Sequence, residues 1–390
     1  MKVYITGYGI KAPKIQSVSD FKDVLENGKV ISEIVKFKNG LKLVCGIITE
    51  DLSVLSPKVL KRYPRTAQMA IAAAYDAIEM ADLTNKMEEK RIGVIIGTSG
   101  GNITDVEKWS VKFHEKNQVS PLSIGNMNAN ALSTAVSSFF ELHGMALTLS
   151  NSCTASTDAI NLGKTLIEAG QFDICIVGGV ESTITDVVVQ GFSKLRLVAK
   201  DIDPGVAGGP FSDDKGFVLS EGAGVIVLES EKSALSRNIE VKGWVEGAYM
   251  NQDGISIYHS DSSGARMIEA MQSCLNGKIP TYVNSQALGI KENDRVEAIV
   301  HRTIFGQNVP ITSMKGMTGH FLGATGAIQA IASLISMEYQ FIPPTIKCNL
   351  VNYPDLPIVT ETKYREVDKV AITSHGYGGN NSCLLLSKKL

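Results

Sequence analysis

The chain has 390 residues, of which 44% are hydrophobic and 20% are charged, and its formal net charge is −2. This length allows a large core and two domain-sized halves, and the near-neutral charge excludes the basic footprint of a nucleic-acid-binding or membrane-surface protein. No apolar run approaches the length of a membrane span, and the start MKVYITGYGI lacks the plan of a signal peptide, so we expect a cytoplasmic protein.

Short apolar runs typical of buried strands alternate with helical patterns along the chain. The predicted strands lie within 3–10, 91–99, 145–152, 172–179, 222–229, 281–286, 309–314 and 370–379. The predicted helices lie within 65–83, 154–170, 265–277, 295–306 and 326–339. This alternation predicts an α/β fold with buried sheets.

A polar stretch, ESEKSALSRN, follows the predicted strand at 222–229 and indicates a soft domain boundary. We therefore expect an N-terminal half over 1–233 and a C-terminal half over 234–390. Both halves have the same strand–helix character, which makes a structural duplication plausible, although no sequence identity between them is visible.

Six scattered cysteines form no C-x-x-C pair and have no histidine at metal spacing, so we expect reduced thiols and no metal site. Cys153 has a distinctive position, because a strand ends at Leu149, a polar turn follows, and a helix rich in small residues begins just after the cysteine. The helix dipole and unpaired N–H groups at such a helix start favour a thiolate. The alternatives are a nucleophile and a buried structural cysteine.

Two glycine-bearing turns hold further candidates. The stretch TSMKGMTGHFLGATGAIQA places His320 between a turn and a Gly/Ala-rich helix, and the nearby Lys315 favours a functional cluster over simple packing. In ITSHGYGGNNSCLLLS, the glycines after His375 form a turn whose N–H groups can approach a ligand. A strand follows this turn rather than a helix, so it is not a dinucleotide fingerprint.

In this order, these segments resemble the elongating β-ketoacyl-acyl carrier protein synthases of the thiolase superfamily, over nearly the whole chain. The blocks that carry the resemblance are VYITGYGI, FDICIVGGVES, PFSDDKGFVLSEGAGVIVLE, MKGMTGHFLGATGA and PPTIKCNL. The resemblance implies a thiolase-like layered αβαβα fold with two structurally related halves, and a dimer. It implies substrates carried on the phosphopantetheine arm of an acyl carrier protein, and neither a metal nor a dissociable organic cofactor.

The resemblance also implies roles for individual residues. Cys153 matches the nucleophile that takes the acyl chain as a thioester. His320 matches a histidine that helps to decarboxylate the malonyl extender, and Lys315 matches the lysine that supports it. Asp294 and Glu297 match an acidic pair behind the site.

The resemblance assigns the turn at Gly378 and Gly379 to a loop beside the nucleophile. The backbone N–H of Tyr377, together with that of Cys153, would form the oxyanion hole. Tyr377 stands where the family usually has a gating phenylalanine.

One departure from the family pattern is sharp. In YVNSQALGI, Gln286 stands where the family has a second histidine, and Ala287 and Leu288 replace a threonine-rich turn. Glutamine can donate an N–H but cannot shuttle a proton, and a general acid or base is worth about 10²–10⁴ in rate. His375 either replaces the lost imidazole or only lines the acyl gate. We interpret the remaining histidines as structural or surface groups: His114, His143, His259 and His301.

Three functions remain open at this point. The first is a condensing enzyme of fatty acid or polyketide biosynthesis that loads Cys153 and extends the chain with malonyl-carrier protein. The second is a non-elongating acyltransferase-type synthase. The third is a partner subunit that resembles a chain-length factor in a heterodimer, although retention of Cys153 weakens that idea.

Overall fold

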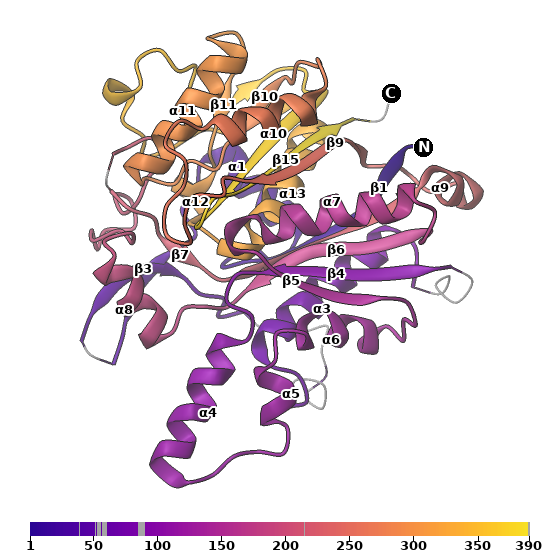
Figure 1. The fold of residues 1–390 in the computed structure, drawn as a ribbon, viewed down its shortest axis with the longest axis vertical. Coiled ribbons are helices and arrows are strands. Elements are labelled where there is room, and N and C mark those ends of the chain that lie inside the picture. Colours follow the sequence, from indigo (N-terminus) through magenta and orange to yellow (C-terminus); the bar gives the residue numbers. More distant parts are fainter. Residues whose placement is uncertain are drawn as a thin grey trace.

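The computed structural model describes residues 1–38, 40–50, 52, 56, 61–84, 90–213 and 215–388. Helices and sheets alternate in αβαβα layers (Figure 1). The two β layers are the two halves of one large sheet. Outer helices cover one face of each half, and α7 and α13 lie between the halves. The predicted thiolase-like layering is therefore confirmed. The layer helices are α3 (Arg65–Met80), α6 (Ala131–Phe139), α7 (Ala155–Glu168), α13 (Thr325–Tyr339), α10 (Ala265–Leu275) and α11 (Lys291–Phe305).

The two halves of the sheet repeat one strand order. The first half runs β5-β4-β6-β8-β1, and the second runs β11-β10-β14-β15-β9. In each half the first three strands pair parallel and the last two join antiparallel. The pairs Tyr4–Trp244 and Ile5–Gly243 join strand β1 of the first half to β9 of the second. This shared topology is the structural relation expected of the two halves.

The strands of the first half are β1 (Val3–Lys11), β4 (Ile92–Thr98), β5 (Ala146–Ser150), β6 (Ile174–Glu181) and β8 (Gly222–Ser230). Those of the second are β9 (Gly243–Gln252), β10 (Tyr282–Asn284), β11 (Ile311–Thr312), β14 (Lys369–Gly376) and β15 (Asn380–Ser387). All the predicted strands and helices are present, although two of the strands are short. The boundary predicted between 233 and 234 falls inside α9 (Glu231–Arg237) and stays a prediction.

Small residues allow the central helices to pack closely. A Cβ at Gly163 of α7 would lie 2.5 Å from Val177 Cγ1, and one at Gly326 of α13 would lie 1.8 Å from Thr157 Oγ1. Each central helix is preceded by a short 3₁₀ turn, η1 (Ser152–Thr154) or η2 (Leu322–Ala324), and these two turns pack together. The chain thus brings two helix starts to one place.

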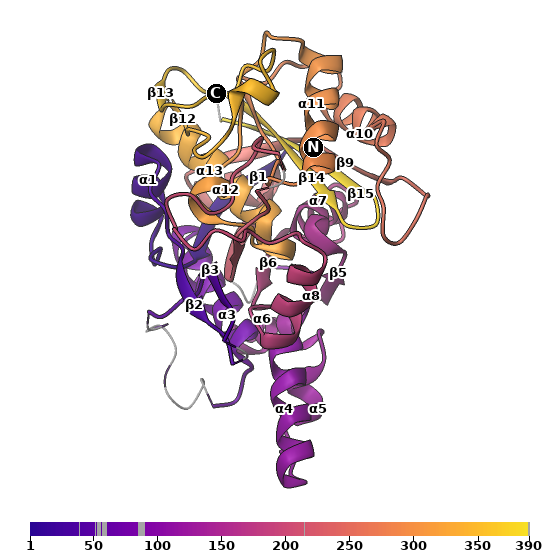
Figure 2. The same cartoon turned by 90° about the vertical axis from the view of Figure 1, so that its left-hand side faces the viewer.

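Several elements lack a clear signal in the sequence. The helix α4 projects from the body with α5 beside it (Figure 2). Among the described residues, no helix is long and apolar enough to cross a membrane. These elements are α1 (Val18–Asn27), α4 (Ile103–Lys116), α5 (Ser123–Met127), α8 (Asp186–Lys194), α12 (Lys315–Thr318), η3 (Leu350–Asn352), β2 (Glu33–Lys36), β3 (Lys42–Gly46), β7 (Leu219–Ser220), β12 (Phe341–Ile342) and β13 (Lys363–Tyr364).

Candidate active site

Cys153 and His320 meet where the two 3₁₀ turns pack together. The Sγ of Cys153 lies 3.2 Å from Nε2 of His320, and the two side chains come from different halves of the chain. Cys153 is 9% exposed and His320 is 1% exposed. Ser152, just before the cysteine, has a φ of 55°, a left-handed conformation that makes the strand-to-helix turn tight. The predicted turn position of Cys153 is confirmed.

Several contacts fix the ring of His320. Its Nδ1 lies 3.0 Å from the hydroxyl of Thr325, and its ring packs edge-on against Phe217 at 5.3 Å between centroids. Its backbone N–H donates to the carbonyl of Val218, and its carbonyl accepts from the N–H of Ser220. Burial, helped by the charge of Lys315, lowers the pKa of His320 well below its usual value. The imidazole is therefore neutral.

The thiol of Cys153 differs from the sequence expectation. The helix start predicts a thiolate, yet burial raises the pKa of Cys153 above its usual value of 9.0. Hydrogen bonds from the Ser152 side chain and the Tyr377 backbone N–H, with the charge of Lys315, lower this pKa by less than burial raises it. Desolvation of the buried sulfur therefore acts against the thiolate that the helix start predicts.

Lys315 is buried beside this pair. Its Nζ donates to the carbonyl of Ser285 at 3.4 Å. Burial lowers its pKa to about 8, while the charges of Glu297, Cys153 and Asp294 act in the opposite direction. The ammonium is thus easily deprotonated for a lysine and can respond to charge that develops at the nucleophile.

The acidic pair fastens the chain on either side of Gln286. Asp294 accepts backbone N–H groups from Leu288 at 2.8 Å, Gly289 at 2.9 Å and Phe211 at 2.6 Å. Burial raises its pKa to about 6. Glu297 accepts from the hydroxyls of Ser285 at 2.6 Å and Thr373 at 2.7 Å.

Gln286 is completely buried, and its amide is committed to the chain. Its backbone N–H donates to the hydroxyl of Thr373 at 2.9 Å, and its side-chain Nε2 donates to the carbonyl of His375 at 3.3 Å. Its Oε1 is buried and has no hydrogen-bond partner among the described residues. As it lies here, the side chain offers an unsatisfied acceptor while its N–H is already engaged.

His375 belongs to a chain of polar side chains. Its Nδ1 lies 2.5 Å from Oδ1 of Asn381, whose Nδ2 donates to Asp253 at 2.7 Å. Since the amide nitrogen of Asn381 is the donor to Asp253, its oxygen faces His375 and accepts the Nδ1 proton. A neutral His375 then has only a lone pair at Nε2. Within the described part of the chain, no hydrogen bond joins His375 to Cys153.

The glycine turn between β14 and β15 lies beside the nucleophile. Gly378 and Gly379 have φ values of 89° and 88°, a backbone conformation that favours glycine. Gly376, the last residue of β14, packs against Ser152. The backbone N–H of Tyr377 acts to lower the pKa of the Cys153 thiol, and the Tyr377 side chain is 49% exposed. An N–H donor is therefore present at the reacting sulfur.

Sequence reasoning missed several residues that build the site. Glu181, at the end of β6, accepts backbone N–H groups from Ser99 at 2.7 Å, Gly100 at 3.1 Å and Gly323 at 3.0 Å. Burial raises its pKa to about 7. A lone carboxylate at the end of an apolar run was the available signal for it. The other missed contacts are Thr325, Phe217, Ser285 and Thr373.

The remaining candidates lie apart from this pair. All six cysteines are free thiols. In the described ranges, no group of three or more His, Cys, Asp or Glu side chains gathers as metal ligands would. His301 is buried with Nε2 at 2.8 Å from the carbonyl of Val309, and burial lowers its pKa to about 4. His114, His143 and His259 are exposed.

The family models that match are "Beta-ketoacyl synthase, N-terminal domain" over residues 1–234 and "Beta-ketoacyl synthase, C-terminal domain" over residues 242–349. Both models agree with the fold and with the order of motifs along the chain.

Among curated relatives, 3-oxoacyl-[acyl-carrier-protein] synthase 2 of Synechocystis sp. is 30% identical, over 99% of this chain and 98% of its own length. The granaticin polyketide putative beta-ketoacyl synthase 1 of Streptomyces violaceoruber is 27% identical, over 99% and 98%. Both alignments span the two halves of the chain.

Solved structures share the fold at lower identity. The ishigamide ketosynthase/chain length factor gives a TM-score of 0.91 at 23% identity, over 100% of this chain and 99% of that one. A beta-ketoacyl synthase from Burkholderia phymatum gives 0.90 at 23% identity, over 100% of both chains. The chain therefore belongs to the β-ketoacyl synthase family.

Proposed function

We propose that the chain is a 3-oxoacyl-acyl carrier protein synthase that loads an acyl group on Cys153 and condenses it with a malonyl extender. It acts as an acyltransferase of fatty acid or polyketide biosynthesis, and a cytoplasmic location is part of the proposal. The observation that carries it is the 3.2 Å contact between the Cys153 thiol and the neutral His320 imidazole. Acyl transfer to sulfur requires such a nucleophile and base.

The first half-reaction uses the protonated thiol. His320 Nε2 accepts the thiol proton as Sγ of Cys153 attacks the carbonyl carbon of the acyl thioester. The negative charge on the carbonyl oxygen receives hydrogen bonds from the backbone N–H groups of Tyr377 and Cys153. The carrier thiol then leaves and takes the proton from His320, so that protons balance and the acyl group remains on Cys153.

The second half-reaction forms the carbon–carbon bond. Loss of CO₂ from the malonyl thioester leaves an enolate, whose oxygen accepts a hydrogen bond from Nε2–H of neutral His320 and whose charge is favoured by Lys315. The hydroxyl of Thr325 donates to Nδ1 in the tautomer that this step needs. The enolate carbon attacks the acyl carbonyl, the C–S bond to Cys153 breaks, and the departing thiolate takes up one proton from solvent, which is the proton that the overall condensation consumes.

A second candidate function has its own supporting observations. The side-chain N–H of Gln286 is held by the carbonyl of His375. The Nδ1–H of His375 is engaged by Asn381 and is not free to replace it as a donor. Leu288 and Ile290 pack in the same apolar cluster as Cys153, where an extender carboxylate needs polar partners. A non-elongating acyltransferase, which loads Cys153 without decarboxylation, is therefore the alternative. Because the nucleophile Cys153 is retained, a purely non-catalytic role as a chain-length-factor-like subunit is disfavoured.

A basic cavity near the active site is a suitable docking place for an acyl carrier protein. Three basic residues, Arg196, Lys200 and Lys215, and one acidic residue, Asp201, line a cavity of about 460 Å³ together with Val198. Val198 bridges to Phe217, whose ring packs on His320, so this cavity adjoins the site. A positive mouth favours an acidic carrier protein and speeds its approach. The phosphopantetheine arm then reaches Cys153 from this side.

We also propose a dimer, with a second copy or with a related synthase. Strand β5 lies at the edge of the sheet, and its Leu147 is exposed. Beside it, the projecting α4–α5 segment exposes Phe113 and Ile124. An unpaired edge and exposed apolar side chains are features that a partner subunit covers.

The test measures the two half-reactions separately in the wild-type protein, Gln286→His and Cys153→Ala. Acyl-carrier protein is supplied and the acyl adduct is read by intact mass, and CO₂ release from malonyl-carrier protein is read independently. The condensing function predicts an adduct, CO₂ release and a β-ketoacyl product in the wild type, with little change in Gln286→His. An adduct with CO₂ release only in Gln286→His identifies the non-elongating alternative, and no wild-type adduct refutes both.

A further inference from the structure

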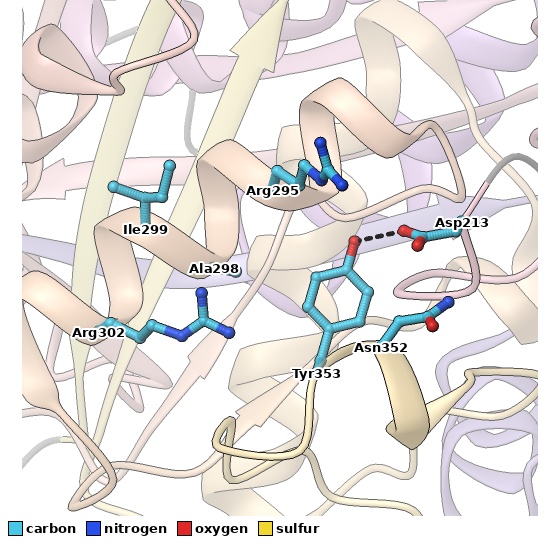
Figure 3. A pocket seen from close by; sticks show the side chains of 7 residues that line it. All are labelled: Asp213, Arg295, Ala298, Ile299, Arg302, Asn352 and Tyr353. Carbon is cyan, nitrogen blue, oxygen red and sulfur yellow. Dashed lines mark hydrogen bonds between the residues drawn. The ribbon is translucent and has the colours of Figure 1, made fainter.

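A separate cavity of about 390 Å³ lies against the outer face of α11, on the side away from the sheet (Figure 3). Its walls are α11, the loop at Asp213, and the chain at Asn352 and Tyr353. We call it the α11 pocket. None of the groups assigned to acyl transfer lines it.

Some hydrogen-bond donors that line the α11 pocket have no partner among the described residues. Arg295 and Arg302 lie two helical turns apart on the same side of α11, and both side chains border the pocket. Arg295 forms no ion pair with any described residue, while Arg302 donates through Nη2 to Asp355 at 2.6 Å and keeps its other N–H groups. Across the pocket, the side-chain amide of Asn352 has no hydrogen bond in the described structure.

The opposite wall limits what these donors can hold. The buried Tyr353 donates its hydroxyl to Oδ1 of Asp213 at 2.9 Å, and burial together with that contact raises the pKa of Tyr353. Ala298 and Ile299 add an apolar floor. Guanidinium groups match carboxylate and phosphate oxygens, whereas the Asp213 carboxylate repels a second negative charge. A small anion with a short apolar body fits this combination.

The pocket wall is tied to the turn that follows Gln286. The ring of Tyr353 packs edge-on against Phe211 at 5.3 Å between centroids, and the backbone N–H of Phe211 donates to Asp294 at 2.6 Å. The same carboxylate accepts the N–H groups of Leu288 and Gly289. These contacts connect the pocket wall to Asp294, and through Asp294 to the backbone next to Gln286.

We propose that the α11 pocket binds a small organic anion, a carboxylate or a phosphate monoester, and that its occupancy alters the reactivity of Cys153 through Asp294. Arg295 supplies the principal contact and Arg302 the second. The binding stands independently of the proposed function, whereas a regulatory effect on acyl transfer rests on it.

Binding is tested by calorimetry with acetate, butyrate, inorganic phosphate and glycerol phosphate, against sodium chloride at matched ionic strength. We expect saturable binding of at least one of them, weakened about tenfold or more in Arg295→Gln, because a charged hydrogen bond is lost. Arg266→Gln, an exposed arginine of α10 paired with Glu269, is the matched control and should bind as the wild type does. The butyrate and phosphate arms decide between carboxylate and phosphate. Absence of saturable binding, or equal binding in Arg295→Gln, overturns the proposal.

Coupling is tested by the rate at which iodoacetamide alkylates Cys153, read by peptide mass spectrometry with and without the binding anion. This readout needs no acyl or malonyl turnover, so it remains valid if the proposed function fails. We expect the anion to change the rate at least about twofold in the wild type, and to lose that effect in Tyr353→Phe, which removes the contact to Asp213. An unchanged rate in the wild type, with binding established, refutes the coupling.

Discussion

The two 3₁₀ turns at the centre of the molecule occupy equivalent places in the repeated halves. Each follows the edge strand of its half, β5 or β11, and leads into a central helix, α7 or α13. Each begins with a non-glycine residue in the left-handed region, Ser152 at φ 55° and Leu322 at φ 44°. The same strained backbone thus appears twice, and it persists because the packing around it holds it in place.

The next residue separates the two turns. In the first turn it is Cys153, whose thiol faces His320, and in the second it is Gly323, which has no room for a side chain. A Cβ at Gly323 would lie 2.3 Å from the backbone nitrogen of Ser99, and the Gly323 N–H donates to Glu181. The first turn, η1, therefore carries the nucleophile, while the second turn, η2, holds the loop of His320 in place through close packing and a hydrogen bond.

The largest expected effect comes from a substitution in the first turn, η1, which carries the nucleophile. Cys153→Ala should abolish the acyl adduct, since it removes the thiol that contacts His320, and it should leave thermal unfolding within a few degrees of the wild type. Intact mass after incubation with acyl-carrier protein measures the adduct. Cys348→Ala, which removes a thiol outside the site, should acylate normally. An adduct that persists in Cys153→Ala would place the nucleophile elsewhere.

A substitution in the second turn, η2, should lower the free energy of unfolding. Gly323→Ala forces a methyl group onto the backbone at Thr98 and Ser99, and overpacking of this kind costs about 1–3 kcal/mol or more. Urea unfolding measures the loss. The matched control is Gly191→Ala in α8, where no atom lies within 4 Å of the added Cβ and a helical alanine gains up to about 1 kcal/mol. Equal stability of the two variants would contradict the assignment of Gly323.

The sequence predicts most of the buried frame but not the elements that lack a regular apolar pattern. The buried strands read as apolar runs, and α3 shows helical spacing. The helix α4 buries only Asp105, and β9 is half-buried along most of its length, so neither has the apolar stripe or alternation that signals an element. The α7 and α13 helices were predictable because their many small residues are typical of close packing.

The site shows the same division. The positions of Cys153, His320 and Lys315 follow from motifs, but their charge states follow from the fold. Burial, which no local pattern reports, keeps the Cys153 thiol protonated and the imidazole neutral. The tautomer of His375 likewise depends on Asn381 and, through it, on a residue of a distant strand end, so the sequence alone left its role open.

A smaller effect should appear in the pH dependence of stability. The pKa of Glu181 rises from 4.5 to about 7 on folding, so the folded protein holds a proton that the unfolded chain releases between these pH values. This group's contribution is complete below pH 4.5 and is lost as pH rises through 7, at about 1.4 kcal/mol per pKa unit. Asp294, raised to about 6, acts in the same direction at lower pH.

Urea unfolding of the wild type and Glu181→Gln across this range measures that contribution. The variant should be less stable at every pH, since it loses an acceptor for the Ser99, Gly100 and Gly323 N–H groups, and its stability should fall less steeply as pH rises. Parallel pH profiles for the two proteins would show that Glu181 does not titrate with folding.

The smallest expected effect concerns the hydroxyl of Thr325, which lies beside the His320 imidazole. Thr325, the first residue of α13, contacts Nδ1 of His320, and its hydroxyl can donate to Nδ1 when the proton is on Nε2. Thr325→Val keeps the shape and removes the hydroxyl, so the rate of CO₂ release should fall by about 2–10-fold, the value of one hydrogen bond. Cys153 acylation should fall less, because that step uses the tautomer with the proton on Nδ1, whose Nε2 lone pair still lies next to Sγ.

The control is Thr303→Val on α11, an exposed threonine whose hydroxyl bonds to the carbonyl of Ile299. It should change neither rate. If Thr325→Val slows acylation and decarboxylation equally, the hydroxyl only holds the ring in place. A selective loss of decarboxylation would mean that the second turn, besides locking the loop, also sets the tautomer that the first turn's chemistry requires.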